Sequence, residues 1–322
     1  ENSRRKRVKN VDDFPFPDWD SWCIGNYIDA GQVTGVNLGR GIPILGSRGC
    51  PFNCKFCSNL GMWTTRYIMR DPVKLVDEIQ EMKERYNLSS FSFMDLTFII
   101  NKKEIKNFAR ELIKRDLEIT YQLPAGTRCE AFDDELAQLL EQSGLRNFAF
   151  APEAADEGIL KTIRKQIKLE TFYEAVKMVT RTNMTVSCFF VIGFPEDTSQ
   201  TIRKSLKMVR RLVFMGVHDV TVSKFTPYPG SDYFTELQRA GRITYDHDDL
   251  GQVIDFYSSE GRSYCDQLDS DQLYRKMIWM YLNFYVLSFV CRPWRVIRVF
   301  YEFFTKDHVE NTRYMRLFSE LF

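Results

Sequence analysis

The sequence predicts an α/β protein in which parallel strands alternate with helices, followed by a mainly helical C-terminal region. Between about residues 41 and 235, short apolar runs alternate with longer stretches whose apolar residues recur at helical spacing. Strands that alternate with helices pair in parallel through right-handed crossovers. After about residue 235 the alternation stops. This pattern alone fits either an open doubly wound sheet or a barrel.

Residues 1–40 are predicted to be a linker segment without long regular elements. The stretch DDFPFPDWDSW (12–22) holds two prolines and several acids among aromatic residues, which suits a linker that its rings pin to the domain. The basic cluster of residues 4–9 is interpreted as a solvated arm.

The core, residues 41–235, contains six predicted strands and five predicted helices. Pro72 suits the first turn of a helix, and Gly144 suits the position after a helix end. The predicted strands are IPILGS (42–47), SFSFMD (90–95), ITYQLP (119–124), NFAFAPE (147–153), TVSCFFVIG (185–193) and VTVSKF (220–225). The predicted helices cover about 72–87, 102–115, 133–143, 169–182 and 198–214.

Residues 236–322 form the predicted C-terminal helical region, in which residues 278–291 read IWMYLNFYVLSFVC. A bilayer span needs about 20 apolar residues, and this run is shorter. We expect a buried helix here. The alternative is a helix that lies on a membrane surface or against a partner, and residues 278–304 are the segment for such a contact.

The composition excludes a general attraction to nucleic acid, because 44 Lys and Arg residues balance 43 Asp and Glu residues. Eight cysteines are present, and three of them crowd into one short stretch instead of spreading as a disulfide framework. We therefore expect a protein of the reducing cytoplasm. A cytoplasmic protein that is peripheral to the membrane is the variant of this expectation. The first residue is Glu, which leaves the true N-terminus open.

The stretch GCPFNCKFC (49–57) places Cys50, Cys54 and Cys57 in a C-x3-C-x2-C array. Thiolates bind soft metals, and three of them could hold three irons of a four-iron cluster while the fourth iron stays open to a ligand. A structural zinc site and an electron-carrying cluster are the alternatives, but each requires a fourth protein ligand.

Polar or special residues follow the predicted strands. The carboxyl ends of parallel strands meet at one edge of a sheet or one mouth of a barrel, so we expect these residues to face a common basin. They are Cys50, Asp95, Arg128, Glu153, the pair Pro195–Glu196, and Tyr228.

The stretch CPFNCKFC, with an aromatic residue before the last cysteine and a predicted strand ahead of it, resembles the signature of the radical S-adenosylmethionine (SAM) superfamily. The resemblance covers about residues 40–235. It implies a partial (β/α)6 TIM-like barrel and a [4Fe–4S] cluster held by Cys50, Cys54 and Cys57. It also implies SAM on the fourth iron, reductive cleavage to a 5′-deoxyadenosyl radical, and removal of a hydrogen atom from a substrate.

The same resemblance implies further SAM-binding residues. Asp95 ends the second strand, where the family receives the amino end of SAM; its alternative role is to cap a turn. Glu153 matches a family glutamate that contacts SAM, although Pro152 and Ala154 depart from the usual neighbours. Lys165 matches a basic residue suited to the SAM carboxylate, and the adjacent Arg164 could serve instead.

Two turn motifs complete the implied site. Gly193 and Pro195, in VIGFPEDT (191–198), resemble the element that passes close to adenine, with Asp197 where Glu is usual. A plain helix start explains part of this motif. The element with Pro229 and Gly230, in FTPYPGSDYF (225–234), is expected to shape the wall of the site.

The stretches DDFPFPDWDSW (12–22), MRDPVKLVDEI (69–79) and CRPW (291–294) resemble the branch of the family that carries a cobalamin-binding (B12) domain. The resemblance implies cobalamin-dependent C-methylation, with the cobalamin held by a domain outside this sequence. A cobalamin-independent or non-methylating radical oxidation, cyclisation or rearrangement is the alternative, and a non-enzymatic iron–sulfur or zinc protein is the third. A flavodoxin- or ferredoxin-type electron donor is implied. The substrate is expected to be a small molecule that is comparatively large and apolar. Its pocket is expected between the barrel mouth and the C-terminal helices, near Tyr228 and Tyr233.

Overall fold

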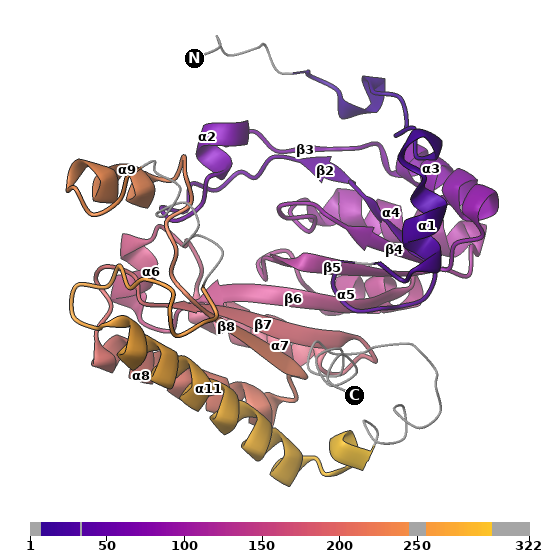
Figure 1. Cartoon of the computed structure of the whole chain (residues 1–322). Coiled ribbons are helices and arrows are strands. Elements are labelled where there is room, and N and C mark those ends of the chain that lie inside the picture. Colours follow the sequence, from indigo (N-terminus) through magenta and orange to yellow (C-terminus); the bar gives the residue numbers. More distant parts are fainter. Residues whose placement is uncertain (1–7, 33, 245–255, 298–322) are drawn as a thin grey trace.

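The computed structural model describes residues 8–32, 34–244 and 256–297 (Figure 1). Residues 4–7 of the basic cluster and residues 298–304 of the proposed contact segment lie outside the described residues.

One parallel sheet forms the centre of the molecule (Figure 1). Its strands follow the order β1-β4-β5-β6-β7-β8, which is the order of the chain without a reversal. A doubly wound sheet would reverse its order at one point, so this sheet is the wall of an open, partial barrel. The predicted barrel and its six strands are therefore confirmed. The strands are β1 (Gly41–Ile44), β4 (Ser90–Phe93), β5 (Thr120–Thr127), β6 (Leu145–Glu153), β7 (Thr185–Ile192) and β8 (Asp219–Lys224).

The five predicted helices are confirmed within a few residues. The first four of these helices pack against one another in chain order along the sheet. Rings such as Phe93 of β4 and Phe108 of α4 fill the space between the helices and the sheet. The helices are α3 (Pro72–Tyr86), α4 (Lys102–Arg115), α5 (Asp134–Gln142), α7 (Leu169–Val179) and α8 (Ser199–Met215). Pro72 begins α3 as expected, after Asp71 accepts from the backbone N–H groups of Val73 and Lys74.

Residues 34–38 fill the inner side of the sheet. The side-chain amide of Gln122, on β5, accepts from the N–H of Val36 at 2.9 Å and donates to the carbonyl of Val36 at 2.7 Å. It also donates to the hydroxyl of Ser92 on β4 at 3.0 Å. The segment ahead of the sheet is thus fixed to two of its strands.

Several short elements were not predicted from the sequence. The expected linker, residues 1–40, contains three short helical segments among its described residues. The division into 1–40, 41–235 and 236–322 stays a prediction. The additional elements are η1 (Val11–Asp13), η2 (Asp20–Trp22), α1 (Ile24–Asp29), β2 (Ser47–Arg48), α2 (Asn59–Trp63), β3 (Ile68–Met69), α6 (Glu157–Thr162) and α9 (Asp232–Arg239).

The free edges of the two outer strands, β1 and β8, are blocked in different ways. In β1, Ile44 accepts from the N–H of Met94, so the neighbouring Pro43 turns its nitrogen away from β4. At β8, the hydroxyl of Tyr281 accepts from the N–H of Val222 at 2.9 Å and donates to its carbonyl at 3.0 Å. A tyrosine of the C-terminal helix therefore takes the place of a neighbouring strand.

The C-terminal helix, α11 (Ser270–Cys291), packs against α8 and β8. The expectation of a buried helix is correct for one face only. That face carries Leu273, Met277, Met280, Phe284 and Ser288. The opposite face is exposed. Within the described residues, no helix is both long and apolar enough to cross a membrane.

Candidate SAM and cluster site

The cysteine loop follows β2 and lies at the carboxyl ends of the strands, where Figure 1 also shows α2, α6 and α9. Its middle is fixed from two sides through the backbone of Lys55. The N–H of Lys55 donates to the carbonyl of Ile163 at 2.9 Å, and its carbonyl accepts from the N–H of Tyr233 at 3.2 Å. The loop is thus held in place by chain segments more than 100 residues away.

Asn59 organises the same loop and was not predicted from the sequence. Its side-chain amide donates to the carbonyls of Cys50 at 3.2 Å, Phe52 at 3.5 Å and Thr64 at 3.3 Å. Its backbone N–H donates to the sulfur of Cys57 at 3.5 Å. One buried asparagine, through its side-chain amide and its backbone N–H, therefore joins the first and last cysteines of the array.

The three thiols are free and half-buried. Burial raises the pKa of Cys50, Cys54 and Cys57, and the cation of Lys165 opposes this rise at each of them. Among the described residues, no three Cys, His, Asp or Glu side chains are placed to hold a single metal ion. A [4Fe–4S] cluster takes each thiolate on a different iron. Three free thiols in one loop are the soft donors that such a cluster binds, so the donor set fits it.

Arg128, at the end of β5, belongs to the same surroundings. Its guanidinium lies 3.7 Å from the ring centroid of Phe52 in the cysteine loop, donates to the carbonyl of Gln166 and pairs with Glu130. It also lowers the pKa of Cys50 and Cys54 against the larger effect of burial. Two cations, Arg128 and Lys165, thus favour the thiolate forms that bind iron.

Glu153 and Lys165 are brought together as a buried ion pair. Lys165 Nζ lies 2.9 Å from Glu153 Oε1, and each side chain is 9% exposed. Burial lowers the pKa of Lys165, but Glu153 and Cys54 more than offset this effect, and the net shift is upward. Glu153 ends β6 with a φ of 67°, a conformation that a residue other than glycine rarely adopts. The neighbouring Arg164 points elsewhere and pairs with Asp232 at 2.6 Å.

Asp95 lies in the place predicted for it, but its oxygens are turned toward the chain. One accepts from the N–H of Gly46 at 3.0 Å, and the other accepts from the hydroxyl of Ser47. Burial raises the pKa of Asp95 to about 6, and these hydrogen bonds oppose the rise. The contacts are those of the alternative role, a carboxylate that fixes the turn ahead of the cysteine loop.

Gly193 and Pro195 form the turn after β7. Gly193 has a φ of 87°, and a Cβ atom there would lie 2.6 Å from Leu273 of α11. Its N–H donates to the buried Asp197 at 2.8 Å. The carbonyl of Pro195 accepts from the N–H of Asp266 at 3.0 Å. Helix α8 begins after Thr198, which caps it, as expected for a plain helix start. The contact of this turn with adenine stays a prediction.

Two buried hydroxyls near the strand ends have no hydrogen-bond partner among the described residues. They belong to Thr97, shortly after β4, and Thr127, at the end of β5. Buried polar groups are nearly always paired, and one without a partner calls for a ligand or water. A polar ligand at this mouth, such as the amino-acid part of SAM, would satisfy that need.

The predicted aromatic wall is only partly available. Tyr233 is buried, donates to Glu196 at 2.5 Å and packs against Phe194 and Phe225. Tyr228 is 43% exposed. Tyr233 is therefore part of the core beside the cysteine loop, whereas Tyr228 remains available for the predicted wall.

A partial parallel barrel with an open three-cysteine loop at its mouth defines a class of metal-cluster enzyme. The family model described as the radical SAM superfamily matches residues 44–209. This chain belongs to the radical SAM superfamily. Membership implies a [4Fe–4S] cluster and SAM as cofactors.

Relatives of known name are similar over most of this chain. An uncharacterized methyltransferase of Pyrococcus horikoshii is 28% identical over 70% of this chain and 47% of its own length. An anaerobic magnesium-protoporphyrin IX monomethyl ester cyclase of Rubrivivax gelatinosus is 30% identical over 59% of this chain and 34% of its own. The chain thus spans about half the length of these relatives, or less.

Solved structures share the fold. The radical SAM methyltransferase TsrM from Kitasatospora setae, with cobalamin and a [4Fe–4S] cluster bound, has a TM-score of 0.56 and 21% identity over 65% of this chain and 41% of its own. The cobalamin-dependent SAM radical enzyme OxsB, with aqua-cobalamin and SAM bound, also has a TM-score of 0.56, with 14% identity over 76% of this chain and 41% of its own.

Proposed function

We propose that this chain is the core of an enzyme that cleaves SAM reductively and uses the resulting radical to methylate a carbon atom of its substrate. The observation that carries the proposal is the open set of three thiols fixed at the strand ends beside a buried cation. When bound, the cluster supplies one electron to the sulfonium of SAM, which yields methionine and a 5′-deoxyadenosyl radical that takes a hydrogen atom from the substrate.

The side chains of the site have separate tasks in this proposal. Cys50, Cys54 and Cys57 hold the cluster, and Asn59 keeps their loop in one conformation through its three carbonyl contacts. Lys165 places a positive charge where the carboxylate of SAM would bind, and Glu153 fixes that charge. The backbone of Gly193 and Pro195 lines the position for adenine.

Cobalamin is the proposed methyl carrier, held by a part of the protein outside this chain. The support is that TsrM and OxsB, which share the fold, bind cobalamin. The cyclase relative supports the alternative, a radical reaction without methyl transfer. Cobalamin that co-purifies with the full-length protein would favour methylation, and its absence after growth with added cobalamin would favour the alternative.

The radical reaction is tested by reconstituting the full-length protein with iron and sulfide without oxygen and then adding dithionite and SAM. We expect 5′-deoxyadenosine from the wild type and none from Cys54→Ala. Cys291→Ala, which removes an exposed cysteine far along the chain, should behave as the wild type. An absence of 5′-deoxyadenosine from the wild type, or an equal yield from Cys54→Ala, would overturn the proposal. In cells, a flavodoxin or ferredoxin is the proposed electron source.

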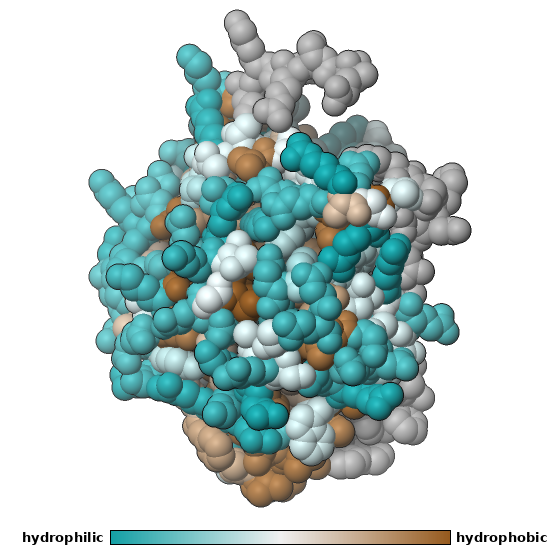
Figure 2. Space-filling view, turned by 90° about the vertical axis from the view of Figure 1, so that its left-hand side faces the viewer, coloured by the Kyte–Doolittle hydropathy of each residue, from teal (hydrophilic) through white to brown (hydrophobic). Residues whose placement is uncertain are grey.

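We also propose that α11 rests on an anionic membrane surface, in keeping with a cytoplasmic enzyme that works at the membrane. Its exposed face carries Trp279, Leu282, Val286 and Val290, and Figure 2 shows hydrophobic side chains gathered at the lower end, where Figure 1 places α8 and α11. The adjacent α8 has five Lys and Arg residues and no acidic residue. An apolar face beside basic residues is typical of helices that lie on anionic lipid.

Sedimentation with vesicles tests this contact. The protein should sediment with phosphatidylcholine vesicles that contain phosphatidylglycerol, and Val286→Asp should abolish this binding. Ile113→Asp, an equivalent change at an exposed position of α4, is the matched control. Equal sedimentation of the wild type and Val286→Asp would contradict the membrane contact.

A further inference from the structure

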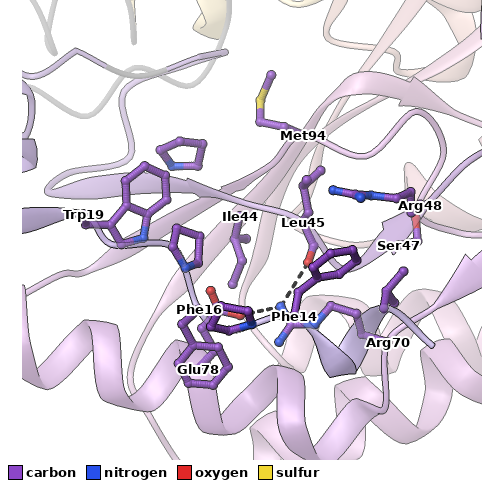
Figure 3. Close-up of a pocket in the computed structure, with 14 residues that line it drawn as sticks. Phe14, Phe16, Trp19, Ile44, Leu45, Ser47, Arg48, Arg70, Glu78 and Met94 are labelled. Carbon is purple, nitrogen blue, oxygen red and sulfur yellow. Dashed lines mark hydrogen bonds and ion pairs between the residues drawn. The ribbon is translucent and has the colours of Figure 1, made fainter. Parts of the chain in front are cut away.

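A cavity of about 430 Å³ lies at the free edge of β1 (Figure 3). The N-terminal segment supplies one wall, with the rings of Phe14, Phe16 and Trp19. The opposite wall comes from Leu45, which follows β1, and Met94, which follows β4. The lining is mostly apolar and the volume lies within the range of small-molecule sites.

Arg48 is a charged group of this cavity that has no acidic partner among the described residues. Its guanidinium points into the cavity in Figure 3 and lies 5.3 Å from the ring centroid of Phe14 and 5.0 Å from that of Trp63. In the described part of the chain, no carboxylate lies within ion-pair distance of Arg48. Two aromatic rings hold the cation in place and leave its hydrogen-bond donors available.

Arg70 lines the same cavity and is neutralised. Its guanidinium pairs with Asp12 at 3.2 Å and with Glu78, and it donates to the carbonyl of Leu45 at 3.2 Å. The two arginines therefore differ in function. Arg70 joins the N-terminal segment, β1 and α3. Arg48 presents to the cavity a positive charge that no carboxylate of the described residues neutralises.

The residues that line the cavity lead along the chain directly into the cysteine loop. Ser47 lines it and donates to Asp95, and Arg48 lies two residues before Cys50. A molecule bound at Arg48 would be held beside the turn that carries the cysteine loop.

We propose that this cavity binds the substrate, and that the substrate has an apolar body with a carboxylate or phosphate group that pairs with Arg48. The rings of Phe14, Phe16 and Trp19 contact the apolar body, and the guanidinium forms charge-assisted hydrogen bonds with the anion. This inference rests on the proposed function, because it assigns the substrate class of the same site. It also moves the substrate away from the C-terminal helix, where the sequence had placed it.

Binding of 1-pyrenebutyrate to the full-length protein, followed by quenching of tryptophan fluorescence, tests the inference. The neutral 1-pyrenebutanol has the same body without the anion. Arg48→Gln should weaken 1-pyrenebutyrate binding about tenfold or more, the effect of losing a hydrogen bond to a charged group, and leave 1-pyrenebutanol unchanged. Met94→Trp, which fills the cavity, should weaken both probes.

Arg110→Gln removes an exposed arginine on α4 and is the matched control, with no expected effect. Competition by dodecanoate and by dodecyl phosphate then shows whether the site prefers a carboxylate or a phosphate. Equal binding of both probes to the wild type and Arg48→Gln would overturn the inference, and so would probe binding that Met94→Trp leaves unchanged. The titration needs neither SAM nor reductant, so its failure is distinct from a failure to form 5′-deoxyadenosine.

Discussion

Replacing Lys165 with methionine should destabilise the protein strongly, because it leaves the carboxylate of Glu153 buried without a partner. The two charged atoms are 2.9 Å apart and each side chain is 9% exposed. Removing one member of a buried ion pair costs about 3–5 kcal/mol, much of it the penalty of the remaining charge. Lys165→Met should therefore lower the free energy of unfolding in urea by about that amount.

A double-mutant cycle separates the pair from its surroundings. Glu153→Gln keeps the size of the side chain and removes its charge, so the double variant with Lys165→Met lacks the stranded carboxylate. We expect the double variant to be more stable than the sum of the single effects predicts, by about 1–3 kcal/mol. Lys204→Met removes a lysine whose side chain is 53% exposed and which pairs with Asp156. It is the control and should cost at most about 1 kcal/mol. Additive effects of Glu153→Gln and Lys165→Met, within about 0.5 kcal/mol, would refute the reasoning.

Three further predictions concern the turns around the site. Asn59→Ala should lower the iron bound after reconstitution, because three carbonyl contacts of the loop are lost; an iron content equal to that of the wild type would contradict this. Burial raises the pKa of Asp95 from 3.8 to about 6, so the folded protein takes up this proton as the pH falls from about 6 to 4. Between pH 7 and pH 4 the contribution of Asp95 to stability should then improve by about 2 kcal/mol. Urea unfolding at the two pH values should show this gain in the wild type and not in Asp95→Asn. Gly193→Ala should lower the melting temperature, because the left-handed conformation costs about 1–2 kcal/mol for a residue with a Cβ atom. A Cβ atom at residue 193 would also clash with Leu273. Adding Leu273→Ala should relieve this clash but not the backbone strain, so full recovery of the melting temperature in the double variant would argue against the strain.

The strands and helices of the core could be predicted because their hydrophobic periodicity and the residues at their ends agree with the fold. Pro72 begins its helix at the expected residue, since a residue without an N–H loses nothing in the first turn. The family could be recognised from the three cysteines because their spacing is itself the chemical signal. Site residues that follow strand ends, such as Glu153, could be placed because parallel strands bring their carboxyl ends together.

The contacts between distant segments could not be predicted. The role of Asn59 depends on three carbonyls that converge only after the loop has closed, and one asparagine carries no periodic signal. The pairing of Glu153 with Lys165 and the turn of Asp95 toward Gly46 depend in the same way on tertiary geometry. The sequence predicts that residues 278–291 are buried, although one face of this helix is exposed, because apolar content does not say how many faces of a helix are covered.

The treatment of the two sheet edges restricts how this core associates with other proteins. β-Augmentation requires a strand edge that offers both donors and acceptors to the incoming backbone. Pro43 offers no donor at its position of one edge, and Tyr281 already occupies both backbone groups of Val222 at the other. These two features disfavour strand addition at the described edges of this sheet, and they protect it against the edge-to-edge polymerisation that threatens open sheets.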